Sequence, residues 1–92
     1  MISIIIPNYN GEDLLKKNLP KVFEAVSHYF QESSQKVEII VVDDGSTDAS
    51  ASVISNIKYQ ISNIPIKLVR NEKNLGFSST VNRGVEAAKG EI

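Results

Sequence analysis

Two apolar runs rich in β-branched residues constrain the fold of this chain more than any other feature. The first, SIIIPNYN at residues 3–10, and the second, VEIIVVDDGSTD at residues 37–48, both stop abruptly in polar, turn-forming residues. Strands of a parallel sheet are buried on both faces and therefore read as continuous Val and Ile. In open α/β sheets, ligands bind just beyond the carboxyl ends of such strands. The runs therefore predict a parallel sheet with a site where they end, whose aspartates, tyrosine and asparagines suit a phosphorylated, aromatic or metal-bound ligand.

Strand and helix patterns alternate along the chain. Strands are predicted at residues 2–6, 37–43 and 66–70, the last with the imperfect alternation of a strand nearer the sheet edge. Apolar residues spaced three and four apart predict helices at about residues 11–31 and 77–89, with another between the second and third strands. The residues expected to face the core are Leu15, Leu19, Val22, Val26 and Phe30 in the first helix, Val53, Ile54, Ile57 and Ile61 in the second, and Phe77, Val81, Val85 and Ala88 in the third. This order predicts an α/β fold with parallel strands and right-handed crossovers.

Proline and glycine mark further expected features of the helices. Pro20 falls inside the first helix, where it cannot donate a backbone hydrogen bond, and it predicts a kink or a restart with Asn18 as the cap. Gly84 permits the third helix to pack closely. Gly90 is placed as the residue just past the end of that helix. Residues 91–92 then resemble the first step into a fourth strand.

The length, charge and composition of the chain exclude several classes of function. Its 92 residues form one domain at most. The net charge is -1, with 10 basic and 11 acidic side chains well mixed along the chain, so no basic stripe is present for nucleic acid. The absence of cysteine excludes disulfides and thiolate metal sites. The apolar runs are too short to span a bilayer and no signal peptide is evident, so a cytoplasmic site of action is expected.

The run DDGSTD has two interpretations. As a turn, it places Asp43 and Asp44 at a strand exit, and Ser46 or Thr47 then caps the second helix with Asp48 in its first turn. As a ligand site, the run accounts for two adjacent carboxylates at the end of a buried strand. Like charges repel each other there, and a role in ligand binding is a reason for a chain to keep them. Strand alternation turns the two aspartates to opposite faces, and Asp43 is the one expected to be structural.

Three motifs in order give the chain a resemblance to a known family. SIIIPNYN, VVDDGSTD and NLGFSSTVNRGVEAAKGEI together resemble the amino-terminal half of a family 2 glycosyltransferase, an enzyme with the GT-A fold. The resemblance covers essentially the whole chain. It implies a three-layer αβα architecture with a mainly parallel sheet in the order 3-2-1, the Rossmann-like βαβαβα half of a GT-A domain. Residues 1–92 would then be a single, incomplete nucleotide-sugar-binding domain.

The resemblance also implies a nucleotide site, residue by residue. The family's nucleotide contacts fall on positions that here are Pro7, Asn8, Tyr9, Asp43, Asp44 and Gly76. Tyr9 would lie against the base, Asp44 would accept a hydrogen bond from the uracil N–H, and Asp43 would help fix the loop or the ribose. Gly76 would let the backbone approach the nucleotide, and Asn82 would tie the third helix to the nucleotide loops. The chemistry agrees, since a carboxylate selects for a donor N–H and a tyrosine face offers stacking area.

Two functions of such an enzyme are expected outside this sequence. A complete member carries an acidic D-x-D-type motif, which holds Mn²⁺ or Mg²⁺ against the diphosphate, on the strand that should start near residues 91–92. A later carboxylate serves as general base to the acceptor hydroxyl. No catalytic and no metal-binding residues are therefore expected in this chain. Many members also carry a basic residue where this chain has Val81, which weakens the case for a phosphate contact there.

The resemblance implies a parent enzyme that is an inverting glycosyltransferase of polysaccharide, glycolipid or glycan synthesis. It would transfer a sugar from a nucleotide diphosphate sugar, most often a UDP-sugar, to a glycan or lipid acceptor. The enzyme would act in the cytoplasm, peripheral to the inner face of the membrane. The 92 residues alone are expected to bind nucleotide without catalysis, and their unpaired strand edge to promote self-association.

Other interpretations compete with this one. A phosphate-accepting receiver domain also uses an acidic pair at strand ends, but it needs a third acid at the end of a further strand, and residues 69–71 contain none. A non-catalytic nucleotide-binding or interaction module fits the same residues. Structural roles are also open for single residues: Tyr9 as a surface aromatic, Gly76 as a loop glycine, and Asn74 and Asn82 as partners of backbone groups.

Overall fold

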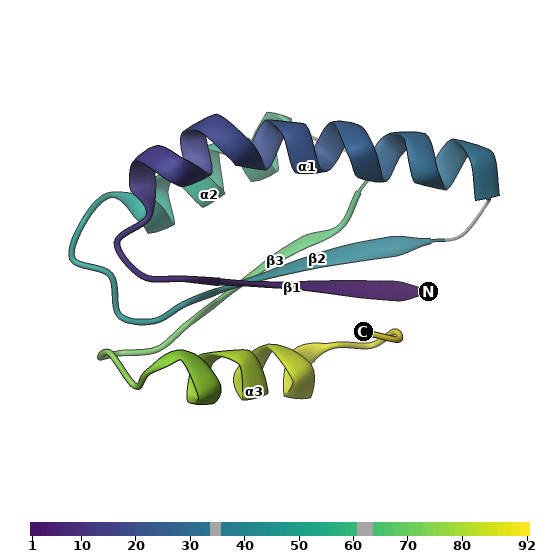
Figure 1. Ribbon diagram of the computed structural model, residues 1–92. Coiled ribbons are helices and arrows are strands. Elements are labelled where there is room, and N and C mark those ends of the chain that lie inside the picture. The colour runs from purple at the N-terminus through teal and green to yellow at the C-terminus, as the bar shows by residue number, and fades with distance from the viewer. Residues whose placement is uncertain (34–35, 61–63) are drawn as a thin grey trace.

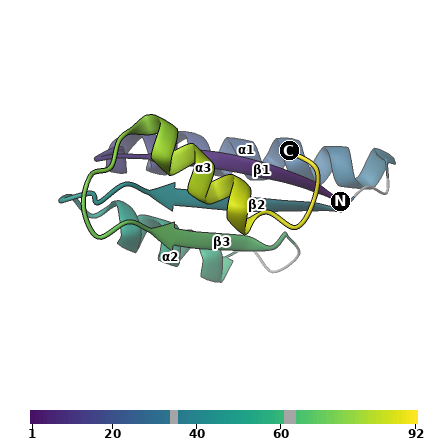
Figure 2. The same ribbon diagram turned by 90° about the horizontal axis from the view of Figure 1, so that it is seen from below.

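A parallel sheet of three strands lies between two layers of helices (Figure 1). The computed structural model describes residues 1–33, 36–60 and 64–92. The strands lie in the spatial order β1 (Ile2–Asn8), β2 (Val37–Asp43) and β3 (Ile66–Arg70). The helices are α1 (Glu12–Ser33), α2 (Ser50–Gln60) and α3 (Phe77–Ala87). Helices α1 and α2 cover one face of the sheet and α3 covers the other (Figure 1, Figure 2), which confirms the predicted three-layer α/β fold and strand order.

β2 is the central strand and is buried along its whole length. It pairs in parallel with β1, where Ile4 lies opposite Ile39, and with β3, where Ile39 lies opposite Ile66. Because side chains alternate between the faces of a strand, Ile39 points toward α1 and α2 and joins the main core. Val42 points the other way and lies beside Gly84 of α3. A strand covered on both faces needs the continuous apolar run that the sequence shows here.

The main core lies between the sheet and helices α1 and α2. Six residues predicted to face it are buried there: Leu15, Leu19, Val26, Val53, Ile54 and Ile57. Val22 is partly buried against this cluster, and Phe23, which the predicted spacing omits, is only 4% exposed. Burial of Phe23 widens the apolar face of α1 by one position. Ile61 and the side chain of Phe30 lie outside the described residues.

α1 continues without interruption through Pro20. The predicted restart with Asn18 as the cap is therefore wrong, and a kink at this position stays a prediction. Pro20 is exposed, and it cannot donate the backbone hydrogen bond to the preceding turn. Leu19 and Phe23, on either side of it, are 2% and 4% exposed. Burial of these flanking apolar side chains offsets the missing hydrogen bond and keeps the helix in one piece.

α2 begins at Ser50, later than predicted. Ser46 and Thr47 therefore do not cap it, and Asp48 precedes the helix instead of lying in its first turn. The reason is that the Ser46 hydroxyl donates to Asp43 over 2.6 Å, which holds residue 46 against the end of β2. The Asp48 carboxylate takes the capping role and accepts the Ser50 N–H over 2.9 Å.

α3 buries a different face from the one predicted. Thr80 and Gly84 are its buried residues. Of the four residues predicted to face the core, two are exposed and two are partly buried: Phe77 at 73% and Val85 at 43%, then Val81 and Ala88. A Cβ atom at Gly84 would lie 2.4 Å from Cγ2 of Ile5, so α3 approaches the sheet more closely than a row of large side chains allows. The close packing predicted at Gly84 is confirmed. Because the helix lies this near to the sheet, the larger apolar side chains of α3 do not fit between them.

After α3 the chain returns to the free edge of β1. The helix ends at Ala87, two residues earlier than predicted. Gly90 serves a close approach, because a Cβ atom there would lie 2.4 Å from the carbonyl oxygen of Met1. Glu91 then pairs in parallel with Ile2, which confirms the predicted first step of a further strand along β1.

A buried serine–glutamate pair holds this turn. Ser3 and Glu38 lie opposite each other in β1 and β2, and they are 2% and 5% exposed. The Ser3 hydroxyl donates to Glu38 Oε2 over 2.6 Å, and the same oxygen accepts the Lys89 N–H over 2.7 Å. The Gly90 N–H donates to Ser3 Oγ over 2.9 Å. These donors, the Ser3 hydroxyl foremost, hold the pKa of Glu38 below its ordinary value despite burial.

Replacing Gly84 with alanine tests the close approach of α3. Alanine is normally the better helix residue by about 1 kcal/mol, but here the added methyl group meets Ile5 and Val42. We expect Gly84→Ala to lower the free energy of unfolding in urea by about 1–3 kcal/mol. Ser79→Ala, at an exposed position of the same helix, is the matched control. A more stable Gly84→Ala protein would contradict the packing.

Candidate functional site

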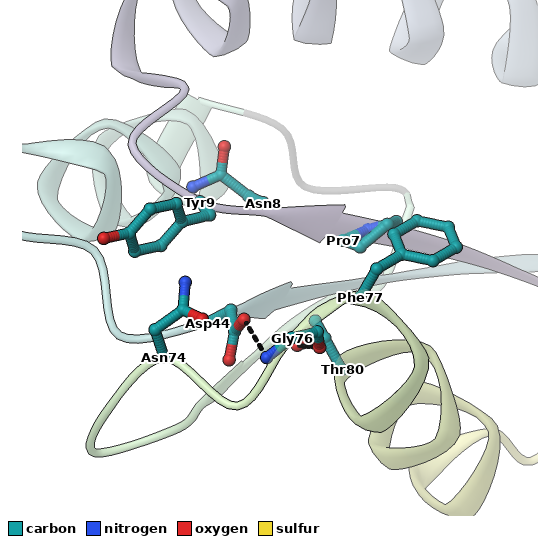
Figure 3. A pocket seen from close by; sticks show the side chains of 8 residues that line it. All are labelled: Pro7, Asn8, Tyr9, Asp44, Asn74, Gly76, Phe77 and Thr80. Atoms are coloured by element: carbon teal, nitrogen blue, oxygen red, sulfur yellow. Dashed lines mark hydrogen bonds between the residues drawn. The ribbon is translucent and has the colours of Figure 1, made fainter.

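An open pocket lies at the carboxyl ends of β1 and β2, where α3 begins (Figure 3). Its volume is about 290 Å³, and it is lined by Pro7, Asn8, Tyr9, Asp44, Asn74, Gly76, Phe77 and Thr80. Small-molecule sites usually measure about 300–1,000 Å³, so the pocket is of the size that holds part of a ligand. The structure brings together five of the six residues predicted for the ligand site, and Asp43 is the one outside the lining.

Asp44 lies at the base of the pocket and holds the loop that leads into α3. Its Oδ1 accepts hydrogen bonds from Asn71 Nδ2 and from the Leu75 N–H, each over 2.8 Å. Its Oδ2 accepts the Gly76 N–H over 2.9 Å (Figure 3). These donors, the Leu75 N–H foremost, hold the pKa of the Asp44 carboxyl below its ordinary value. Asp44 is therefore ionised at neutral pH although it is only 4% exposed.

Among the described residues, Asp44 is the one charged residue of the pocket lining, and the loop hydrogen bonds do not use all of its acceptor positions. A carboxylate accepts in about four directions, two on each oxygen. The hydrogen bonds from the loop use both directions of Oδ1 and one direction of Oδ2. Besides the Leu75 N–H, the Thr80 hydroxyl beside the carboxylate contributes to the lowered pKa of Asp44, and it donates to the Gly76 carbonyl over 2.8 Å. A ligand donor at Oδ2 would share the fourth direction with Thr80, whose hydroxyl can donate to Gly76 instead.

Residues after β3 and in α3 brace the loop around Asp44. Asn71 follows β3 and is 1% exposed. While its amide nitrogen donates to Asp44, its Oδ1 accepts a hydrogen bond from Arg83 Nη1 over 2.7 Å. The tie between α3 and the loops that was predicted for Asn82, an exposed residue, is thus made by the neighbouring Arg83.

Asp43 points to the opposite face and has the structural role expected from strand alternation. It is fully buried, at 0% exposure. Its Oδ1 accepts hydrogen bonds from Asn8 Nδ2 over 3.0 Å and from the Ser46 hydroxyl over 2.6 Å. Its Oδ2 accepts the Ser46 N–H over 3.1 Å, and Arg70 Nε lies 3.4 Å from the same oxygen. Asp43 therefore fixes the loop after β2, and its burial argues against direct contact with a ribose.

The loops after β1 and β2 hold each other in place. Asn10, with a positive φ of 51°, donates its N–H to Ser46 Oγ over 2.9 Å and accepts the Thr47 N–H over 2.8 Å. The Glu12 N–H donates to the Asp48 carboxylate over 3.1 Å, and the Glu12 carboxylate accepts an N–H just before α2 over 2.9 Å. Asp48 thus accepts N–H groups at the start of both helices and Glu12 accepts one just before α2, which ties the loop after β1 to the loop after β2.

Two aromatic rings stand at the rim of the pocket. Tyr9 follows β1 and is 50% exposed, and Phe77 opens α3 and is 73% exposed. The two rings lie on opposite sides of the space above Asp44 and Gly76 (Figure 3). Gly76 has a φ of 97°, a conformation that other residues rarely adopt, so its first role is to shape the loop. That conformation directs its N–H to Asp44 and starts α3 at the edge of the pocket.

The sequence patterns did not assign four residues of this region to a ligand site: Asn71, Asn74, Phe77 and Thr80. Two signals could have found some of them. Asn71 follows the third strand as Asp44 follows the second, and the ends of parallel strands meet at one edge. Thr80 and Gly84, four residues apart, form a face of small side chains, which marks the side of a helix that packs closely.

The described residues contain no cluster of side chains typical of a divalent-metal site. In the described ranges, no three His, Cys, Asp or Glu side chains come together as a possible ligand group. Asp43 and Asp44 point to opposite faces, and both carboxylates accept hydrogen bonds from N–H or O–H groups of the protein. A metal would have to displace those donors to gain two carboxylate ligands.

Comparisons with known proteins agree with these observations. Residues 3–92 match the family model described as "Glycosyl transferase family 2". The chain is 33% identical over 91 residues to glycosyltransferase GlyG of Streptococcus pneumoniae and 34% identical to a dolichol-phosphate mannosyltransferase of Pyrococcus furiosus. It is 31% identical to an undecaprenyl-phosphate 4-deoxy-4-formamido-L-arabinose transferase of Pseudomonas fluorescens. These alignments cover 99% of this chain but only 27%, 23% and 25% of the three relatives, so the chain spans about a quarter of their length.

A solved structure has the same fold. The mannosyltransferase PcManGT from Pyrobaculum calidifontis, in complex with GDP-Man and Mn²⁺, aligns with a TM-score of 0.82. The alignment covers 97% of this chain and 24% of that protein, at 23% sequence identity. The likeness shows that the αβα arrangement described here is that of a GT-A glycosyltransferase.

The buried carboxylate of Asp44 makes stability depend on pH. Its pKa is lower in the folded than in the unfolded chain because of the donors led by the Leu75 N–H. The resulting stabilisation is complete above the ordinary pKa of about 4 and is lost as the pH falls through the lower folded value. We expect urea unfolding of Asp44→Asn to show lower stability at neutral pH and a shallower decline on acidification than wild type. Asp13→Asn, at an exposed position of α1, is the control. If the free energy of unfolding of Asp44→Asn falls with decreasing pH as steeply as that of wild type, Asp44 is not the source of the pH dependence.

Proposed function

The chain belongs to glycosyl transferase family 2, and we propose that residues 1–92 form the donor-nucleotide part of an enzyme that transfers a sugar from a nucleotide diphosphate sugar. They constitute a single, incomplete nucleotide-sugar-binding domain of that enzyme. The observation that carries the proposal is the pocket at the carboxyl ends of β1 and β2, the place where open α/β sheets bind nucleotides. Pro7, Asn8, Tyr9 and Gly76 provide its surface, Asp44 its charged base, and Asp43 the support beneath the loop.

Uracil is the base that suits this pocket best, and a UDP-sugar is therefore the proposed donor. The imide edge of uracil presents one N–H between two carbonyl oxygens, and the Asp44 carboxylate is the charged acceptor in the pocket lining. The side-chain amide of Asn74, in the same lining, can donate to a uracil carbonyl. Guanine presents an N–H beside an amino group and would need two adjacent acceptors. The neighbour PcManGT holds GDP-Man, so GDP is the nucleotide against which selectivity should be measured.

Sugar transfer needs groups that the described residues do not supply. We place the divalent metal, Mn²⁺ or Mg²⁺, and the general base in the remainder of the parent enzyme. The metal would stabilise the leaving diphosphate, and the base would take the proton of the acceptor hydroxyl. Direct displacement by that hydroxyl inverts the anomeric carbon. The 92 residues alone are then a nucleotide-binding unit without transfer activity.

The proposed acceptor is a glycan or a lipid carrier. The names of two relatives specify dolichol phosphate and undecaprenyl phosphate, which supports a lipid-linked acceptor. Such a substrate would place the parent enzyme in the cytoplasm, peripheral to the inner face of the membrane. In the ranges that the structure describes, no helix is both long enough and apolar enough to cross a bilayer.

The sequence predicts that the unpaired edge of β1 promotes self-association, and from the hydrogen bonding of that edge we propose that the association is weak. The Ile2 N–H bonds toward β2, so Ser3, Ile5 and Pro7 direct their backbone groups to the free edge. The Ser3 N–H is taken by the Glu91 carbonyl, and Pro7 has no N–H. Within the described part of β1, Ile5 is left with the outward N–H. Size-exclusion chromatography with light scattering should therefore show a monomer at micromolar concentration; a stable dimer would contradict this blunted edge.

Calorimetric titration with UDP tests the proposed function. We expect weak, selective binding of UDP over GDP, because the Asp44 carboxylate, most of whose acceptor positions the loop already uses, matches one imide N–H. Added Mn²⁺ should change the affinity little, since the described carboxylates are already engaged. Tyr9→Ala should weaken UDP binding roughly fivefold to a hundredfold through lost base stacking.

His28→Ala is the control for this titration, because His28 is exposed on α1 and is not in the pocket lining. Circular dichroism establishes that each protein is folded before it is titrated. A folded wild-type protein that does not bind UDP at millimolar concentration, or that binds GDP more tightly than UDP, would contradict the proposed donor site. Binding that Tyr9→Ala leaves unchanged would contradict the role of Tyr9.

A further inference from the structure

Phe77 is the most exposed large apolar side chain among the described residues, at 73%. It is the first residue of α3, it follows Gly76 directly, and it lines the pocket. Single exposed apolar side chains are common on folded proteins, so the exposure of this ring alone says little. Its position at the rim of the pocket, opposite Tyr9, is the informative observation.

α3 does not need Phe77 for its attachment to the sheet. Its close contact with the sheet is made by Gly84, beside Ile5 and Val42. Its amino-terminal end is held by the hydrogen bond between the Gly76 N–H and Asp44. Phe77 is therefore held in position by its neighbours while its ring makes no contribution to the buried face of the helix.

The surroundings of the ring have the features of a site for a flat, polar-edged heterocycle. Tyr9 stands on the opposite side of the pocket, and Asp44 and Gly76 lie at its base between the two rings (Figure 3). Oδ2 of Asp44, which accepts the Gly76 N–H, lies at this base. A base whose N–H points to Asp44 would lie between the two aromatic side chains. Aromatic side chains stack on bases of any sequence because every base has a π-face.

We propose that Phe77 is a second aromatic contact for the nucleobase. The base lies between the side chains of Tyr9 and Phe77 and donates its N–H to the Asp44 carboxylate. This inference rests on the proposed function and adds a binding residue to it. Phe77 contributes to affinity for the base itself, independently of the sugar that the nucleotide carries. At 73% exposure, the ring is accessible to a base that enters the pocket.

Titration of the 92-residue chain with UDP separates the contribution of Phe77 from that of the rest of the pocket. We expect Phe77→Ala to bind UDP roughly fivefold to a hundredfold more weakly than wild type, and Phe77→Tyr to bind it within about twofold. Val85→Ala removes apolar surface that is 43% exposed on the same helix and should leave the affinity unchanged. In proton NMR spectra, UDP should shift the Phe77 ring resonances, and inorganic pyrophosphate, which has no base, should not.

The possible outcomes distinguish this inference from the proposed function. If wild type and Phe77→Ala bind UDP equally well, the second aromatic contact is wrong and the donor site stands. Equal losses in Phe77→Ala and Val85→Ala would also overturn the inference, because they would indicate a general effect of apolar surface. If folded wild type binds no UDP, the donor site fails and this inference fails with it.

Discussion

The ionised carboxylate of Asp44, buried at the end of the central strand, is the contact on which the pocket depends. A charge at 4% exposure is tolerated because three protein donors from residues 71–76 satisfy it. Those hydrogen bonds draw the loop after β3 across the end of β2 and set the point where α3 begins. The loop, the first turn of α3 and the base of the pocket are therefore one unit, organised around a single anion.

A second buried carboxylate on the same face of β2 holds the other end of α3. Glu38 lies six residues before Asp44, a distance of about 20 Å along a strand. α3 has 11 residues and is about 16 Å long, so its two flanking turns reach the two acids. Asp44 accepts N–H groups just before the helix, and Glu38 accepts the Lys89 N–H just after it. Two strand carboxylates thus determine where α3 lies, and Gly84 between them determines how close it comes.

The adjacent acids Asp43 and Asp44 have different roles because a strand turns successive side chains to opposite faces. Asp43 faces the α1 and α2 side, where Asn8 and Ser46 enclose it completely. Asp44 faces the α3 side, where the pocket opens. Asp43 therefore organises the loop after β2, whereas Asp44 organises the loop before α3 and lines the pocket. The proposed donor site uses this division, with the aromatic rim supplying stacking and Asp44 accepting the N–H of the base.

Much of the fold followed from local pattern: the Val and Ile runs predicted β1 and β2, and the spacing of Leu15 and Leu19 predicted the core face of α1, because burial on a strand or helix repeats with a short period. The alternation of side chains along a strand likewise predicted that Asp43, and not Asp44, is the structural aspartate. The start of α2, the tie through Arg83 and the exposure of Phe77 depended instead on contacts between residues far apart in the chain. The sequence alone determined the parallel α/β sheet and the polar strand ends, since both are set by neighbouring residues. Only the tertiary structure decided which face α3 buries, because the tight fit of Gly84 on Ile5 outweighs the apolar periodicity that would have turned Phe77 inward.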